Sequence, residues 1–161
     1  MNDYTERTLP LYFAYGSNLE PEQMEMRCPG YRLLCRAILH DHVLRFQGHS
    51  RIWGGAIATI EHTPGAMVHG VVFELAPDQF NALDRSEGCV APGHPDNQYD
   101  RVQLPVQLEY GEWIQVFTYI MRPQTPGRPS RSYRWAILKG MRHYSLPITA
   151  IEALEAEPTV D

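Results

Sequence analysis

The chain has 161 residues, of which 43% are hydrophobic and 20% are charged. This length is enough to bury a core without metal or disulfide support, so we expect one domain over residues 10–161 behind a flexible tail at residues 1–9. The formal net charge is −5 and there is no run of Lys or Arg. That balance argues against a nucleic-acid or anionic-membrane partner, because both require concentrated positive charge.

The sequence lacks two further kinds of feature, and this limits the class of protein. No apolar stretch approaches the roughly 18 residues of a membrane-spanning helix, and polar residues 1–10 do not resemble a signal peptide, so we expect a cytoplasmic protein. The three cysteines, Cys28, Cys35 and Cys89, are odd in number and form no CxxC pair. Neither a disulfide framework nor a zinc site is therefore expected, and the sequence predicts no metal and no cofactor.

Residues 11–19 read Leu-Tyr-Phe-Ala-Tyr-Gly-Ser-Asn-Leu, an aromatic run that stops at a turn. The aromatic part predicts a first strand, and the Gly-Ser-Asn part predicts a loop that tolerates unusual backbone angles. Backbone N–H groups in such a loop can converge on an anion, and Gly16 would let a ligand approach them closely. The alternative is that Ser17 or Asn18 only caps the helix expected from Pro21 to about Arg27.

The next part of the chain predicts strand material. Alternating or continuous apolar residues indicate strands at residues 31–40, 41–47, 52–60 and 67–75. Gly54 and Gly55 lie in the third of these segments, where missing side chains indicate close approach by another backbone or by a ligand.

A helix is expected from Pro77 to about Glu87, with Gly88 just past its end. Phe80, Leu83 and Glu87 are spaced i, i+3 and i+7, so the Glu87 carboxylate should point inward with the apolar residues. Burial and the negative end of the helix dipole would both raise its pKa. The alternative is a frayed last turn from which Glu87 reaches water.

The second half begins with an irregular loop at residues 89–98. Strands are expected at residues 99–104, 106–110 and 112–121, and helices at residues 130–145 and 147–156. The whole pattern predicts an α+β fold, in which a mixed sheet of about six or seven strands curls into a small β-barrel with three or four short helices.

Several motifs together resemble the γ-glutamylcyclotransferase family. They are the Tyr-Phe-Ala-Tyr-Gly-Ser-Asn-Leu run at residues 12–19, Trp53-x-Gly55-x-Ile57-Ala58-Thr59-Ile60, Gly70-Val71-Val72, Leu83-Asp84-x-x-Glu87-Gly88 and Pro129-Ser130-x-x-Tyr133. They run in order over nearly the whole chain.

The resemblance implies a small mixed barrel and a reaction that converts a γ-glutamyl amide to 5-oxoproline and a free amine. It implies that Glu87 is the acid/base and that a γ-glutamyl small molecule is the binding partner. The substrate-binding residues it implies are Tyr12, Phe13, Ala14, Tyr15, Gly16, Ser17, Asn18 and Tyr133.

One segment departs from the family pattern, because residues 89–98 look longer than the corresponding loop of the animal enzymes. A longer loop beside the site would change the pocket for the leaving amine. Three substrate classes therefore stay open: a γ-glutamyl amino acid, a γ-glutamylamine and a metabolite carrying a γ-glutamyl protecting group.

Other chemistries have weaker support in the sequence. His40 and His42 share a predicted strand face and would need a third ligand to hold a metal. Cys89 lacks the positive surroundings of a reactive thiolate, and Ser17 has no identifiable base beside it. The alternative to an enzyme is a non-catalytic binding module that keeps the pocket. An inward Glu87 would have no evident use in such a module.

Overall fold

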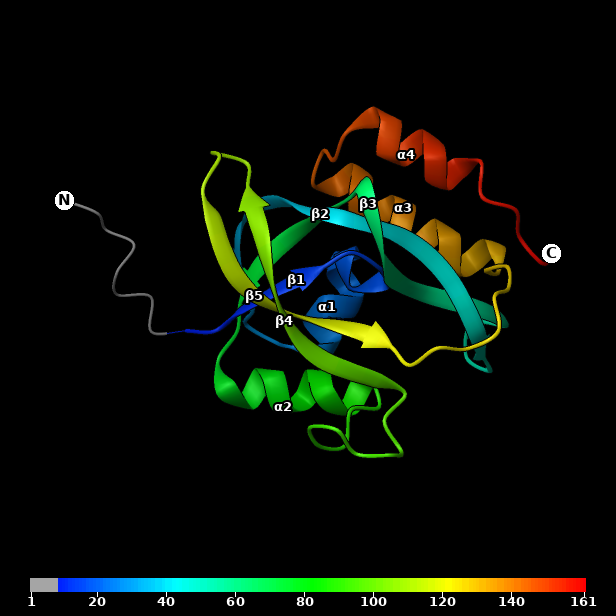
Figure 1. Cartoon of the computed structure of the whole chain (residues 1–161). Helices are drawn as coiled ribbons and strands as arrows, with labels where there is room; N and C mark the ends of the chain where they lie inside the picture. Colours follow the sequence, from blue (N-terminus) through cyan, green and yellow to red (C-terminus); the bar gives the residue numbers. More distant parts are fainter. Residues whose placement is uncertain (1–8) are drawn as a thin grey trace.

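Residues 9–161 are described in the computed structural model, and they build a closed five-stranded barrel (Figure 1). The strands follow one another around the barrel in the order β1-β3-β2-β4-β5, and a parallel contact between β1 and β5 closes it. The other neighbouring strands pair antiparallel, so the sheet is mixed as expected. The strands are β1 (Leu11–Ala14), β2 (Arg32–Ser50), β3 (Gly55–Glu74), β4 (Tyr99–Leu108) and β5 (Trp113–Met121).

The helices lie around this barrel, with α2 on one side and α3 and α4 on the other (Figure 1). They are the 3-10 helix η1 (Ser17–Leu19) and the α-helices α1 (Pro21–Arg27), α2 (Pro77–Ser86), α3 (Arg131–His143) and α4 (Ile148–Glu155). None of the helices within residues 9–161 is long and apolar enough to cross a membrane. The tail predicted at residues 1–9 lies outside the described residues, apart from Leu9.

The predicted number of six or seven strands is wrong, because segments expected to be separate form single bent strands. Strand β2 continues through Asp41 at φ 59°, and β3 continues through Gly65 at φ 84°. The Asp41 carboxylate accepts a hydrogen bond of 2.9 Å from the Gly65 backbone N–H, which ties the two bends together. The register shifts between His40 and His42, where one residue of β2 faces four of β3, and the two strands pair on both sides of this irregularity. Residues 99–104 and 106–110 likewise merge, since β4 runs through Pro105.

The Gly54-Gly55 pair is explained by backbone packing and not by a ligand. A Cβ built on Gly55 would lie 2.7 Å from the Ser130 nitrogen and 2.9 Å from the Arg128 carbonyl oxygen. Gly54 has φ 79° in the turn between β2 and β3. Close backbone approach at Gly55 places the start of α3 directly against β3.

Helix α3 also fixes the loop that follows β1. A Cβ on Gly140 would lie 2.3 Å from the Leu19 carbonyl carbon, so only glycine allows this contact between α3 and η1. At the start of α3, the Ser130 hydroxyl accepts a hydrogen bond of 3.2 Å from the Tyr133 N–H. The Gly-Ser-Asn loop is thereby held between the barrel and α3.

Candidate active site

The loop after β1 borders a small cavity. No described residue accepts a hydrogen bond from the backbone N–H of Gly16, Ser17 or Asn18, and all three residues line the cavity. Backbone N–H groups without a protein acceptor are rare beside a protein interior, so these three donors are free to bind a ligand.

Asn18 connects the loop to the rest of the site, and its side-chain amide is fully used. Its Nδ2 donates to the Tyr12 hydroxyl at 2.9 Å and to Oε1 of Glu87 at 3.0 Å. Its Oδ1 accepts from Gln23 Nε2 at 3.0 Å and from Arg27 Nη1 at 2.9 Å. The residue is only 4% exposed, so these four contacts set its orientation. Asn18 binds to side chains of the site, and the N-cap of α1 is Glu20.

The Glu87 carboxylate points inward, as its spacing with Phe80 and Leu83 predicts. Helix α2 ends at Ser86, and the Glu87 N–H still donates to the Leu83 carbonyl at 2.9 Å. The side chain is 15% exposed, which excludes the frayed arrangement in which it reaches open water. Burial raises the pKa of the Glu87 carboxyl, and the Arg27 charge and the Asn18 hydrogen bond offset part of that rise.

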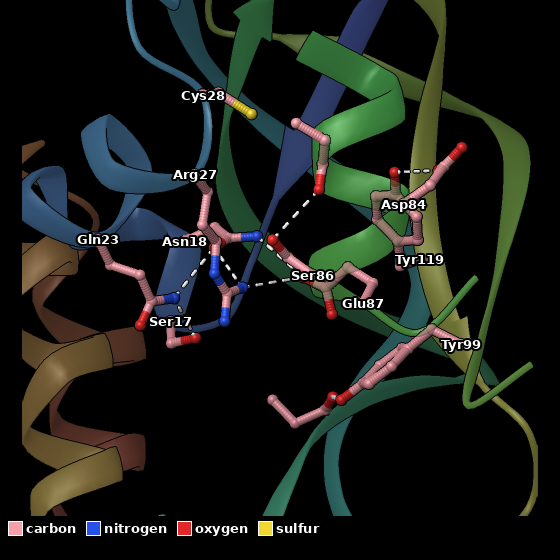
Figure 2. Close-up of polar contacts among 12 residues, drawn as sticks. Ser17, Asn18, Gln23, Arg27, Cys28, Asp84, Ser86, Glu87, Tyr99 and Tyr119 are labelled. Atoms are coloured by element: carbon pink, nitrogen blue, oxygen red, sulfur yellow. Dashed lines mark hydrogen bonds and ion pairs between the residues drawn. The ribbon is translucent and has the colours of Figure 1, made fainter. Parts of the chain in front are cut away.

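Arg27 places a positive charge beside the negative charge of Glu87. Figure 2 shows Arg27, Asn18 and Glu87 as a cluster between α1 and the end of α2. The Arg27 Nη1 lies 3.3 Å from Oε1 of Glu87 while it also donates to Asn18. Gln23, one turn earlier, donates to Ser17 Oγ at 2.7 Å. The i, i+4 spacing of Gln23 and Arg27 puts both side chains on the face of α1 that meets the loop. Neither was predicted as a site residue.

Buried tyrosines form the other walls of the cavity and are held by the barrel. The Tyr133 hydroxyl accepts from the Ala58 N–H at 2.8 Å, and the Tyr99 hydroxyl donates to the Ala58 carbonyl at 2.5 Å. The Tyr15 hydroxyl donates to the Tyr119 carbonyl at 2.5 Å. Burial raises the pKa of Tyr133, Tyr99 and Tyr15 above the ordinary range, so these phenols are neutral. Among the described residues that line the cavity, Glu87 is the only carboxylic acid.

The structure brings most of the predicted site residues together. Those that line the cavity are Tyr12, Tyr15, Gly16, Ser17, Asn18, Glu87 and Tyr133. Phe13 and Ala14 do not line it, because their side chains are fully buried in the barrel wall. Phe13 packs against Gly70, where a Cβ would come within 2.7 Å of its ring.

The sequence of this site matches a known family. Residues 12–141 match the family model described as "Gamma-glutamyl cyclotransferase, AIG2-like". The chain belongs to this family. The match includes the loop, Glu87 and Tyr133, so the residues gathered around the cavity all lie inside the family domain.

Curated relatives and solved structures agree with the family match. The chain is 36% identical over 150 residues to the Gamma-glutamylcyclotransferase of Homo sapiens, covering 91% of this chain and 77% of that protein. It is 35% identical, with the same coverage, to the Gamma-glutamylcyclotransferase of Mus musculus. A solved structure titled Gamma-glutamyl cyclotransferase superposes with a TM-score of 0.88 at 33% identity, covering 94% of this chain and 89% of that one.

The alternative chemistries find little support in the described part of this family member. His40 Nε2 lies 2.9 Å from the Gln107 amide oxygen, and the register shift interrupts the alternation that would place it on one face with His42. Residues 9–161 contain no group of three or more His, Cys, Asp or Glu arranged to hold a metal ion. Cys89 is buried, and the Ser17 hydroxyl accepts from Gln23, which is not a base.

Proposed function

We propose that this protein is a γ-glutamyl cyclotransferase, which converts a γ-glutamyl amide to 5-oxoproline and releases the amine. The observation that carries the proposal is the arrangement of one inward carboxylate, Glu87, beside three unpartnered backbone N–H groups in one cavity. Family membership and the curated relatives with this activity in their names support it.

The loop would bind the γ-glutamyl end of the substrate. The N–H groups of Gly16, Ser17 and Asn18 offer donors to its α-carboxylate, with Gly16 leaving room for close approach. The neutral phenols of Tyr12 and Tyr133 would pack along the chain of the glutamyl group. Holding both ends folds the flexible chain so that its α-amine approaches its own γ-carbonyl, and such orientation lowers the barrier by several kcal/mol.

Glu87 would then act first as base and then as acid. The reacting substrate has a neutral α-amine. As its nitrogen attacks the γ-carbonyl carbon, the Glu87 carboxylate takes one of the two amine protons and then delivers it to the departing nitrogen as the amide bond breaks. No water is consumed. An α-amino group titrates near pH 8 and an ordinary Glu near 4.3, so transfer of a proton from the ammonium form to Glu87 would cost about 5 kcal/mol without help. Burial raises the pKa of Glu87 and narrows this gap.

The identity of the leaving amine separates the alternatives within this activity. A γ-glutamyl amino acid, a γ-glutamylamine and a metabolite with a γ-glutamyl protecting group all share the same reacting atoms. The rival without chemistry is a binding module that keeps the pocket. An inward carboxylate whose ionised form is disfavoured by burial favours the enzyme, because an unreactive pocket gains nothing from that cost.

The experiment is to incubate the protein with γ-glutamyl-alanine, γ-glutamyl-lysine isopeptide and glutathione in heavy-oxygen water and to follow the products by mass spectrometry. Cyclisation releases 5-oxoproline without heavy oxygen, whereas hydrolysis would release glutamate that carries it. Unlabelled 5-oxoproline from any of the three supports the proposal. Labelled glutamate would show that the protein hydrolyses the amide and does not cyclise it. If the protein binds the compounds but forms no product, the result would favour the binding module.

We also propose that residues 10–161 form one catalytic domain and that it works in the cytoplasm. The closure of the barrel through the Tyr12 and Phe117 pair and the packing of α3 on Leu19 support the first point. Buried thiols at Cys28 and Cys89 suit a reducing compartment.

A further inference from the structure

A second pocket adjoins the first one and shares four of its lining residues. Ser17, Glu87, Tyr99 and Tyr133 line both, so the Glu87 carboxylate stands at the boundary between them. We call the first pocket, which Gly16, Ser17 and Asn18 line, the inner pocket, and the second one the outer pocket. The unpartnered N–H groups of the loop belong to the inner pocket. If the γ-glutamyl group occupies the inner pocket, the bond that breaks lies beside Glu87 and the departing amine extends into the outer pocket.

Arg27 gives the outer pocket a specific chemistry. It is the only cationic side chain among the described residues that line this pocket, and it is 25% exposed. Only its Nη1 is used, for Asn18 and Glu87, and no described residue accepts a hydrogen bond from its Nε or Nη2. The Nε and Nη2 groups of this guanidinium can donate two parallel hydrogen bonds to the two oxygens of a carboxylate.

The outer pocket also has an apolar wall, formed by Ile52, Trp53 and Ile57. The turn between β2 and β3 brings Ile52 and Trp53 to its edge, and Ile57 follows on β3. The Trp53 ring lies 5.1 Å from the Tyr133 ring, which fixes it beside the inner pocket, whereas Ile52 is 93% exposed. A large apolar side chain this exposed at the edge of a pocket is available to contact a ligand.

We propose that the outer pocket binds the departing amino acid, with Arg27 pairing with its carboxylate and Trp53 and Ile52 contacting its side chain. The proposal rests on the proposed function and names Arg27, Trp53 and Ile52 as the residues that discriminate between leaving amines. In a γ-glutamyl amino acid the carboxylate carbon of the leaving amine is two bonds from the breaking nitrogen. A guanidinium that already contacts Glu87 is therefore placed to reach it while Glu87 reaches the nitrogen.

The pairing would also affect the acid/base. The Arg27 charge holds the pKa of Glu87 lower than burial alone would set it. A carboxylate bound to the free edge of Arg27 offsets that charge and moves the pKa of Glu87 toward that of the α-amine. A substrate with the carboxylate therefore gains in proton transfer as well as in binding.

The test compares γ-glutamyl-L-alanine with γ-glutamylethylamine, which differ only in the carboxylate of the leaving amine. We expect the wild-type kcat/KM to favour the alanine substrate by at least about tenfold, and Arg27→Gln to bring that ratio close to one. Loss of the Arg27 contact with Glu87 affects both substrates and cancels in the ratio. Arg45→Gln, which breaks the exposed Arg45 pair with Glu61, is the matched control and should keep the wild-type ratio. A ratio that Arg27→Gln leaves unchanged would overturn the proposal.

A binding measurement separates this proposal from the failure of the proposed function. In the Glu87→Gln background, calorimetry should show that Arg27→Gln weakens binding of γ-glutamyl-L-alanine by about tenfold and leaves γ-glutamylethylamine unchanged. This result would support the carboxylate site even if the wild type released no 5-oxoproline from either compound. Equal binding of both compounds with and without Arg27 would reject it.

The apolar wall is tested separately with γ-glutamyl-leucine and γ-glutamylglycine. Trp53→Ala should remove most of the preference for leucine and leave the turnover of glycine similar. An unchanged preference would remove the side-chain contact from the proposal.

Discussion

Replacing Asn18 by Asp is the sharpest single perturbation of the acid/base environment, because the side chains are nearly the same size. The amide Nδ2 that donates to Oε1 of Glu87 at 3.0 Å becomes a carboxylate oxygen at a similar distance. The Oδ1 that accepts from Gln23 and Arg27 is kept. The substitution therefore converts the hydrogen bond to Glu87 into a contact between two acids. The hydrogen bond to Tyr12 is reversed, since the Tyr12 hydroxyl can donate to the new oxygen, and the contacts with Gln23 and Arg27 stay in place.

The size of the effect follows from that distance. Two unit charges 3 Å apart repel by about 5 kcal/mol at an effective dielectric constant of about 20, and Arg27 relieves part of this. The pair avoids the repulsion by keeping one proton, so its pKa rises further above the already raised pKa of Glu87. A group with a raised pKa contributes stability below that pKa and loses it as the pH rises through it. Asn18→Asp should therefore be close to wild type in acid and destabilised by about 2–3 kcal/mol at mildly alkaline pH, where a hydrogen bond to a charged group is missing.

The assay is the pH dependence of kcat/KM together with the melting temperature at acid and mildly alkaline pH. We expect the acidic limb of the rate profile to move to higher pH, and the melting temperature to fall only on the alkaline side, by about 2–4 °C per kcal/mol. Asn97→Asp is the matched control, since buried Asn97 also donates to a carboxylate, Asp100, at 2.9 Å, but outside the cavity. It should destabilise the fold without moving the acidic limb. An acidic limb unmoved in Asn18→Asp would refute the role of the Asn18 contact in setting the pKa of Glu87.

Three further outcomes follow from the same structure. Tyr133→Phe leaves the buried Ala58 N–H without its acceptor and should cost about 1–3 kcal/mol, read as a lower melting temperature; an unchanged value would contradict the 2.8 Å contact. Gly140→Ala drives a Cβ into the Leu19 backbone and should cost about 1–3 kcal/mol and raise KM through the displaced loop, whereas a fully stable variant would show that α3 does not fix the loop. In the wild type, kcat/KM should fall as the pH drops through the pKa of Glu87, with a midpoint above its usual value of 4.5, because only the ionised form accepts a proton; a lower midpoint would contradict its burial.

Local patterns in the sequence predicted the helices and the inward direction of Glu87. The spacing of Phe80, Leu83 and Glu87 reports which face of a helix is buried, and that depends only on neighbouring residues. The motif resemblance located the loop, since residues 12–18 are contiguous. These features are local, so one sequence contains enough information to predict them.

The strand number and the role of Arg27 depend on contacts between distant residues. Asp41 and Gly65 are typical turn residues, yet pairing continues across both bends because β2 and β3 bend together. Arg27 is 60 residues from Glu87 in the chain and looks like an ordinary charge at the end of a short helix. Only the folded arrangement shows that it faces Asn18 and Glu87.

The rate of 5-oxoproline release by Glu87→Gln tests the central claim most directly. Glu109→Gln is the matched control, because Glu109 is also partly buried and paired with an arginine, Arg36, at 2.8 Å, but it does not line the cavity. Glu87→Gln should bind the γ-glutamyl substrate and lose at least about a hundredfold in rate, while Glu109→Gln keeps the wild-type rate. Because burial disfavours the ionised Glu87, the variant should also melt no lower than wild type at mildly alkaline pH. A folded Glu87→Gln protein that releases 5-oxoproline at a rate close to wild type would contradict the account.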